Sequence, residues 1–156
     1  MSVNMVADYK NKKVYAQIDR LERQSRRAVR QGFFRLGNDL KETSRRLIID
    51  PPKTGRLYRI SGRKRKHRAS APGQPPANMT GSLQRSISFK IKGAESMEFG
   101  SNPQKSDSAK KTWLYARRLE VGDARIARRP YLEPSVRKNA RNGRKHFESE
   151  LRKELK

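Results

Sequence analysis

The sequence predicts an α+β fold, and three observations indicate it. A helical apolar stripe runs through residues 9–49, a period-two alternation begins near residue 83, and a second helical stripe follows residue 130. Helical and alternating runs that are segregated along a chain are typical of α+β domains. We therefore expect a long N-terminal helix, a small antiparallel sheet and a C-terminal helix in a single domain over residues 1–156.

Residues 9–49 are predicted to form one long helix with a single apolar face. Gly32 and Gly37 are the places where so long a helix is expected to bend or break. The Asp50-Pro51 step should end it, because a residue before proline is pushed out of the α region. The apolar face consists of Val14, Ile18, Leu21, Val29, Phe33, Leu36, Leu40 and Leu47.

Residues 50–81 fit neither a helical nor a strand period. Lys and Arg dominate residues 53–68, which contain no acid, so we expect a basic loop there. The following prolines fix φ and remove backbone donors, which predicts an extended arm near polyproline II that lies on a surface. These prolines are Pro72, Pro75 and Pro76.

Residues 82–122 are the predicted sheet region. Apolar and polar residues alternate from Leu83 to Ile91, as in a half-buried strand. Beyond a turn near Gly93 the alternation resumes at Met97 and Phe99, which indicates a hairpin. We expect four further side chains to be buried against this sheet, those of Trp113, Tyr115, Leu119 and Val121.

Residues 130–155 are predicted to form the C-terminal helix. Pro134 is acceptable in its first turn, and Gly143 should weaken its middle. Its predicted apolar stripe consists of Leu132, Val136, Ala140, Phe147 and Leu151.

Composition points to a polyanionic or acidic partner. The chain has 39 Lys and Arg against 15 Asp and Glu, a formal net charge of +24. Such a balance is typical of proteins that bind DNA, RNA or acidic protein surfaces. Without cysteine, and with two unpartnered histidines, we expect no metal site and no disulfide. No phosphate loop, nucleophile motif or paired carboxylate is evident, so we expect neither enzymatic activity nor a cofactor. No run of apolar residues is long enough to span a membrane.

Four segments together resemble the neck or tail-completion family of long-tailed bacteriophages, small head–tail connector proteins related to lambda-type minor tail proteins. They are "KTGRLYRI" (53–60), "HRASAPGQPPANMTGSLQRSI" (67–87), "YARRLEVG" (115–122) and "RRPYLEPSVRKN" (128–139). The chain departs from the family pattern at Ser135, where alanine is usual, and in its more basic run at residues 61–67. The matching positions are Gly55, Leu57, Pro72, Gly73, Pro75, Pro76, Gly81, Leu83, Ile87, Tyr115, Glu120, Gly122, Arg129, Pro130, Leu132 and Pro134.

The resemblance implies a structural virion protein without catalysis, made in the host cytoplasm and assembled at the head–tail junction. It implies a ring of copies, about six or twelve by symmetry matching, that completes the tail or neck. The implied partners are the portal-side connector, the tail tube or tail terminator proteins, and genomic DNA in the lumen.

Two sets of residues are predicted to make contacts in such an assembly. The proline arm and the segment before the last helix are predicted to form the subunit interface, where arginines would pair with carboxylates. Its residues are Pro72, Gly73, Pro75, Pro76, Arg128, Arg129, Pro130 and Tyr131. The basic run is predicted to contact DNA phosphates or an acidic partner through Arg63, Lys64, Arg65, Lys66 and Arg68.

Two other functions fit the sequence. A basic nucleic-acid-binding protein of ribosomal or chromatin type would explain the net charge, although the sequence contains no zinc-finger pattern, aromatic-rich RNA-binding strand or evident helix-turn-helix. A minor tail component at another position along the tail would fit the same family resemblance.

Overall fold

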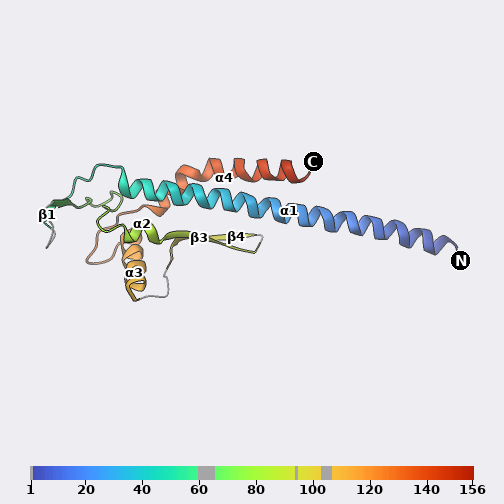
Figure 1. Cartoon of the computed structure of the whole chain (residues 1–156), viewed down its shortest axis with the longest axis horizontal. Helices are drawn as coiled ribbons and strands as arrows, with labels where there is room; N and C mark the ends of the chain where they lie inside the picture. Colours follow the sequence, from blue (N-terminus) through green and yellow to red (C-terminus); the bar gives the residue numbers. More distant parts are fainter. Residues whose placement is uncertain (1, 60–65, 94, 103–106) are drawn as a thin grey trace.

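Helix α1 (Ser2–Ile49) is the axis of the molecule, and its 48 residues form one helix that ends just before Asp50-Pro51. The computed structural model describes residues 2–59, 66–93, 95–102 and 107–156, and it confirms the α+β class. Helix α4 (Leu132–Glu154) runs antiparallel to α1 along one side, and the hairpin of β3 (Ile87–Lys92) and β4 (Ser96–Ser101) lies on the other (Figure 1). The N-terminal half of α1 extends beyond α4 and the hairpin.

The predicted break in α1 is wrong, because the helix continues through both glycines. A Cβ atom on Gly32 would lie 2.3 Å from the ring of Phe147 in α4, and one on Gly37 would lie 2.5 Å from the ring of Phe89 in β3. The glycines therefore mark the places where the two neighbouring elements approach α1 most closely. Gly143 has the same role in α4, since its Cβ would lie 3.1 Å from Leu36.

The predicted hairpin is confirmed, and its register pairs Ile87 with Ser101 and Ile91 with Met97. It begins later than predicted, because Leu83 lies in the short helix α2 (Ser82–Ser86) rather than in the strand. The predicted basic loop contains a second small antiparallel pair, β1 (Leu57–Arg59) and β2 (Lys66–Arg68). The described residues thus form two separate two-stranded sheets.

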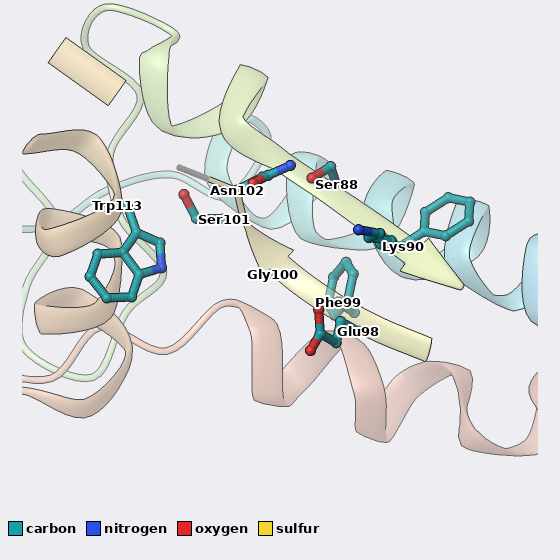
Figure 2. Close-up of a pocket in the computed structure, with 9 residues that line it drawn as sticks. Ser88, Lys90, Glu98, Phe99, Gly100, Ser101, Asn102 and Trp113 are labelled. Atoms are coloured by element: carbon teal, nitrogen blue, oxygen red, sulfur yellow. The ribbon is translucent and has the colours of Figure 1, made fainter. Parts of the chain in front are cut away.

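The second half of the predicted sheet region is wrong, since helix α3 (Asp107–Val121) occupies it. Only Ala116 and Leu119, three residues apart on one face, are buried among its described side chains. Trp113, Tyr115 and Val121 are 36%, 49% and 69% exposed, so they are not the core residues that the sequence predicted. Trp113 faces the β3–β4 hairpin across a shallow cavity of about 240 Å³ (Figure 2).

The hydrophobic core lies at the C-terminal end of α1, where the hairpin, α3 and the start of α4 converge. Its fully buried members are Ile48, Ile87, Leu119 and Tyr131. Partly buried side chains packed against it are Leu83, Phe99, Ile126 and Leu132.

Helix α4 has nearly the predicted bounds, but its predicted stripe is only partly correct: Phe147 lies against α1 and Leu132 packs on the core, whereas two other members are exposed. Val136 is 49% exposed and Ala140 is also exposed, whereas the buried positions are Ser135, Asn139, Gly143 and Glu150. These small and polar residues allow the two helices to approach closely, and hydrogen bonds and ion pairs connect them along their length.

The polar contacts between α1 and α4 form a ladder. Ser44 donates to the hydroxyl of Ser135 at 2.7 Å. Further along, Asn139 donates to Thr43 at 2.9 Å, His146 pairs with Asp39 at 2.7 Å, and Arg35 pairs with Glu150 at 2.9 Å. The ladder satisfies the buried polar atoms and fixes the register of the two helices.

Candidate assembly site

The described parts of the four segments that carry the family resemblance lie together in one place, which we call the joint: residues 53–59, 67–87, 115–122 and 128–139. Backbone hydrogen bonds connect them. Gly55 N donates to Ala69 O at 3.0 Å, Gly73 N donates to Arg128 O at 2.8 Å, and Arg129 N donates to Leu119 O at 2.6 Å. Residues from distant parts of the sequence therefore hold one local arrangement.

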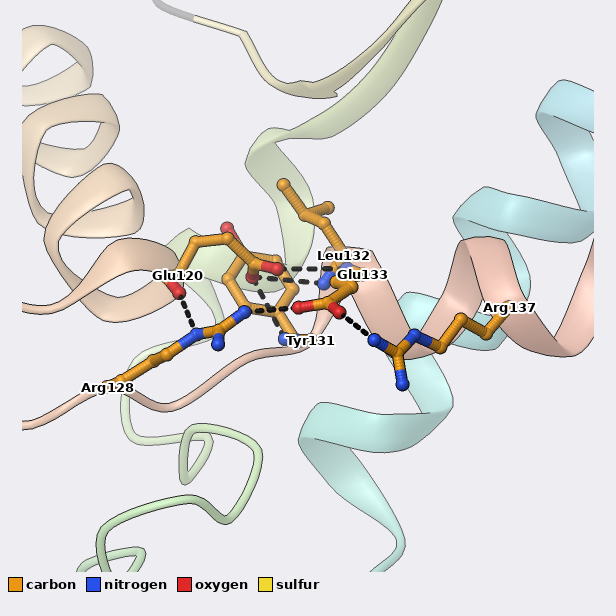
Figure 3. A network of polar contacts seen from close by, with 6 residues as sticks. All are labelled: Glu120, Arg128, Tyr131, Leu132, Glu133 and Arg137. Atoms are coloured by element: carbon orange, nitrogen blue, oxygen red, sulfur yellow. Dashed lines mark hydrogen bonds and ion pairs between the residues drawn. The ribbon is translucent and has the colours of Figure 1, made fainter.

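Glu120 is the central side chain of the joint (Figure 3). Its carboxylate accepts hydrogen bonds from the backbone N–H groups of Tyr131, Leu132 and Glu133, at 2.9, 3.1 and 2.9 Å. These are N–H groups at the start of α4 that have no partner within the helix. A negative charge at this end is also favoured by the helix dipole. Glu120 therefore fixes where α4 begins and how it leaves α3.

Arg128 and Arg129 are occupied within the chain. Arg128 donates to the carbonyl of Glu120 at 3.0 Å and pairs with Glu133, which also pairs with Arg137 (Figure 3). Arg129 donates through Nε to Ser70 O at 3.2 Å and through Nη1 to Ala127 O at 3.1 Å. The arginines predicted to pair with a neighbouring subunit thus already stabilise the joint.

A tight turn returns the chain from α3 to the joint. Gly122 ends α3 with φ +83°, a conformation that favours glycine. The Asp123 carboxylate accepts hydrogen bonds from the backbone N–H groups of Arg125 and Ile126, at 2.8 and 2.7 Å, and these bonds lower the pKa of Asp123. The turn places Arg128 next to Gly122, where an added Cβ would lie 3.3 Å from Arg128 N.

The proline arm is ordered by contacts with its own chain. Gln74 Oε1 accepts hydrogen bonds from the backbone N–H groups of Thr54 and Ala71, both at 3.1 Å. Gly73 has φ +79° and donates to Arg128, as described above. The surface on which the predicted arm lies is therefore, at least at these positions, that of its own chain, because the rest of the joint supplies these hydrogen-bond partners.

The structure divides the predicted subunit interface into an outward and an inward part. Pro72, Gly73 and Arg128 are exposed. Pro76 and Tyr131 are buried in the chain, and Tyr131 belongs to the hydrophobic core. The remaining members, Pro75, Arg129 and Pro130, have intermediate exposure.

Burial raises the pKa of Tyr131 above its ordinary value, and the nearby charge of Glu120 acts in the same direction. The Tyr131 hydroxyl has no hydrogen-bond partner among the described residues. The phenol is therefore kept neutral in the core.

A groove of about 540 Å³ opens beside the joint, between the proline arm and α3. The sequence did not predict it, because it depends on α3 being a helix. The rings of Tyr58 and His67, which lie edge to face at 5.4 Å, form part of its wall. Its wall also includes Met79, Leu83, Tyr115 and Arg129. Burial raises the pKa of Tyr115, which argues against a role as a base at neutral pH.

The described residues contain no cluster of three or more His, Cys, Asp or Glu that is close enough to hold a metal ion. Nor does any helix among them combine the length and apolarity needed to cross a membrane.

The predicted DNA-contact residues are only partly placed. Lys66 and Arg68 are exposed on β2, and Arg68 donates to the carbonyl of Gly55 at 3.3 Å. Arg63, Lys64 and Arg65 lie outside the described residues.

Another basic surface lies on the exposed sides of α4, and we call it the α4 basic face. The sequence carries its signal, since Lys and Arg recur there at helical spacing, but a search for apolar stripes passes over it. Its exposed members are Arg137, Lys138, Arg141, Arg144, Lys145, Arg152 and Lys153.

Comparisons with known proteins identify no relative: no family model, curated protein or solved structure matches the chain.

Proposed function

We propose that this chain is a structural virion protein of a long-tailed phage. It acts at the head–tail junction, where copies form a ring that completes the tail or neck and joins it to the DNA-filled head. The observation that carries the proposal is the joint, because the four resembling segments converge there although they span residues 53–139.

The residues of the joint have roles that suit a structural protein. Glu120 caps α4, Gly73 and Gly122 adopt turns with positive φ, and Arg129 binds backbone carbonyls. Each of these groups holds backbone in place. A motif of this kind maintains a shape, which is what a connector between two larger particles requires.

The outward surfaces supply the contacts that a connector needs. Pro72 and Gly73 are exposed on the joint and are suited to contact a neighbouring copy or the portal-side connector. The groove beside the joint would accept an apolar segment of the tail tube or tail terminator protein.

The α4 basic face favours a second candidate function, that of a nucleic-acid-binding protein of ribosomal or chromatin type. Seven exposed cations on one helix face would attract a phosphate backbone. Within the first proposal the same face would line the lumen and contact genomic DNA, so the face alone does not separate the two candidates.

Deleting the gene from the phage that encodes it tests the first proposal. Lysates should contain DNA-filled heads and tails that do not join, and the wild-type gene supplied in trans should restore infectious particles. Cryo-electron microscopy of virions should show ring density at the junction that fits α1, α4 and the β3–β4 hairpin. Normal virion yields after the deletion, or absence of the protein from virions, would overturn the proposal and favour the nucleic-acid-binding alternative.

A further inference from the structure

One face of α1 carries a heptad pattern along most of the helix, and we call it the seam. Its positions alternate between spacings of three and four, the pattern that keeps one face toward a partner helix. The seam consists of Asn11, Val14, Ile18, Leu21, Ser25, Ala28, Gly32, Arg35 and Asp39.

The C-terminal part of the seam is covered by α4. Ala28 is fully buried, Gly32 lies against Phe147, and Asp39 pairs with His146. The part of the seam that α4 covers ends near Arg27, which lies 3.9 Å from Glu154 at the end of α4.

The N-terminal part of the seam is bare. All described side chains of residues 11–23 are exposed, and Val14, Ile18 and Leu21 are 52%, 53% and 52% exposed. The same face of one continuous helix is therefore covered in one half and uncovered in the other. Three aliphatic side chains in line on a protruding helix are a surface that a partner helix would bury.

The charges around the bare seam indicate what kind of partner fits. Residues 11–27 contain eight charged side chains, and only Glu22 lies beside the seam. The other positions beside it are Tyr15, Gln17 and Gln24, which are uncharged. Basic side chains lie on the outer faces, away from the seam, so a polyanion is not the partner that would cover the seam. A helix with the same weakly charged borders, such as a second copy of this segment, fits the seam best.

We propose that the bare seams of two copies pair as an antiparallel two-stranded coiled coil. The orientation follows from the position of α4. In a parallel pair, the partner's α1 would continue straight along the seam into the space that α4 occupies from Arg27 onward. In an antiparallel pair, the partner's α1 leaves in the opposite direction and meets no obstacle.

The same geometry sets the register. The uncovered part of α1 extends from Ser2 to about Arg26, so its midpoint is near Val14. Two such segments that overlap fully in antiparallel orientation bring Val14 next to Val14 of the other copy. Leu21 and its counterpart then lie on opposite sides of the midpoint, about 21 Å apart at 1.5 Å per residue.

This pair has a two-fold axis, whereas copies in a ring about a single axis all point the same way. The antiparallel dimer is therefore a form of the free protein that separates before ring assembly. This last step rests on the proposed function, but the pairing itself does not.

Cysteine cross-linking of the full-length protein tests the pairing, because the chain has no cysteine of its own. We would compare single variants V14C, L21C and A16C, the last on the outer face of α1, under mild oxidation. V14C should form the disulfide dimer at least about tenfold faster than A16C, because pairing holds the two thiols at a high effective concentration. L21C should be no faster than A16C.

Each other pattern overturns a stated part of the inference. Fast cross-linking at both Val14 and Leu21 would show a parallel pair, and fast cross-linking at Leu21 alone would show a different register. Equal slow rates at all three positions would show that the seams do not pair. None of these outcomes bears on the head–tail assignment, which the gene deletion tests separately.

Sedimentation velocity provides a second measurement with a charge-matched control. Ile18→Glu should weaken dimerisation by about tenfold or more, since it places a charge in the buried seam, whereas Ala16→Glu should not. Added salt should strengthen the dimer by screening its like charges, whereas it would weaken binding to a polyanion. A dimer that resists Ile18→Glu, or that dissociates in salt, would contradict the seam as the interface.

Discussion

At the scale of single residues, one carboxylate connects the end of α3 to the start of α4. Glu120 accepts hydrogen bonds from the first N–H groups of α4, so its loss leaves them without a partner. Glu120→Ala should lower the free energy of unfolding by about 2 kcal/mol, the range of a strong helix cap. Glu120→Gln should lower the free energy of unfolding by less, because the amide oxygen of Gln still accepts hydrogen bonds from these N–H groups. Urea denaturation measures both.

Glu148→Ala is the control, because Glu148 makes only an exposed i,i+4 pair with Arg144. It should cost less than about 0.5 kcal/mol. If Glu120→Ala were as mild as this control, the cap would not stabilise the fold as we describe.

A second residue-scale prediction concerns the helical glycines. Gly32→Ala adds helix propensity of about 1 kcal/mol, but its Cβ would lie 2.3 Å from the Phe147 ring. Overpacking at such contacts costs about 1–3 kcal/mol, so the variant should be destabilised on balance. Phe147→Leu removes the ring. In that background, Gly32→Ala should lower the free energy of unfolding by less, or should raise it. A cycle of the four proteins in urea gives the coupling, and additive effects would refute the close contact.

Tyr131 should make stability depend on pH at the alkaline end. Because burial raises the pKa of Tyr131 above the ordinary value of 10.0, its stabilisation is complete below pH 10 and is lost as the pH rises further. There the unfolded state ionises while the folded state stays neutral, so stability falls by about 1.4 kcal/mol per pH unit.

Tyr131→Phe removes this dependence while keeping the ring. It should leave stability at pH 7 unchanged or slightly higher, since the hydroxyl has no partner among the described residues. Unfolding curves between pH 8 and pH 11 for the two proteins should diverge above pH 10. Parallel curves would mean that the phenol ionises equally in both states.

At the scale of elements, α1 consists of two halves with different support. Residues 33–48 pack against α4 and the β3–β4 hairpin, whereas residues 11–23 are exposed on all sides. An isolated helix of that length is only marginally stable in water. In dilute solution, hydrogen exchange of residues 11–23 should therefore show little protection, and that of residues 33–48 should be strong. Strong protection of both halves in the monomer would contradict this description.

The elements that the sequence predicted well are those whose apolar residues follow a local period. This holds for α1, for the β3–β4 hairpin and for the bounds of α4. The face of α4 was not predictable in this way, because the contact with α1 uses Ser135, Asn139 and Gly143, and a search for apolar stripes passes over such residues. Helix α3 was missed because its buried face contains little more than Ala116 and Leu119, while its exposed aromatics resemble a strand.

The joint was predictable in part. The resemblance indicated that its segments belong together, but it gave Glu120 no role. A carboxylate that caps a helix eleven residues further along the chain depends on the turn at Gly122 and on the packing of α3. Such contacts leave no periodic trace in the sequence. For the same reason, the sequence did not show that Arg128 and Arg129 bind within the chain.

At the scale of the whole molecule, a net charge of +24 makes self-repulsion and attraction to polyanions unavoidable. The structure arranges this charge unevenly. The α4 basic face presents seven exposed cations, whereas the bare seam of α1 has almost no charge beside it. Nucleic acid and a second copy are therefore expected on different surfaces, and the two contacts do not compete.

This arrangement predicts a salt-dependent interaction with DNA that involves α4. Binding to a DNA duplex should weaken linearly with the logarithm of salt concentration, with a slope of about −0.9 for each phosphate contacted. Replacing Arg141 and Lys145 together by Gln removes two cations from the α4 basic face and should reduce the slope by about 2. The matched control replaces Arg20 and Arg23, exposed cations on the free half of α1, by Gln. Fluorescence anisotropy over a salt series should show a smaller change for the control. Equal changes would mean that DNA binding depends on net charge alone and that α4 presents no preferred phosphate surface. The physical reason for placing α4 toward the lumen of a ring would then be lost.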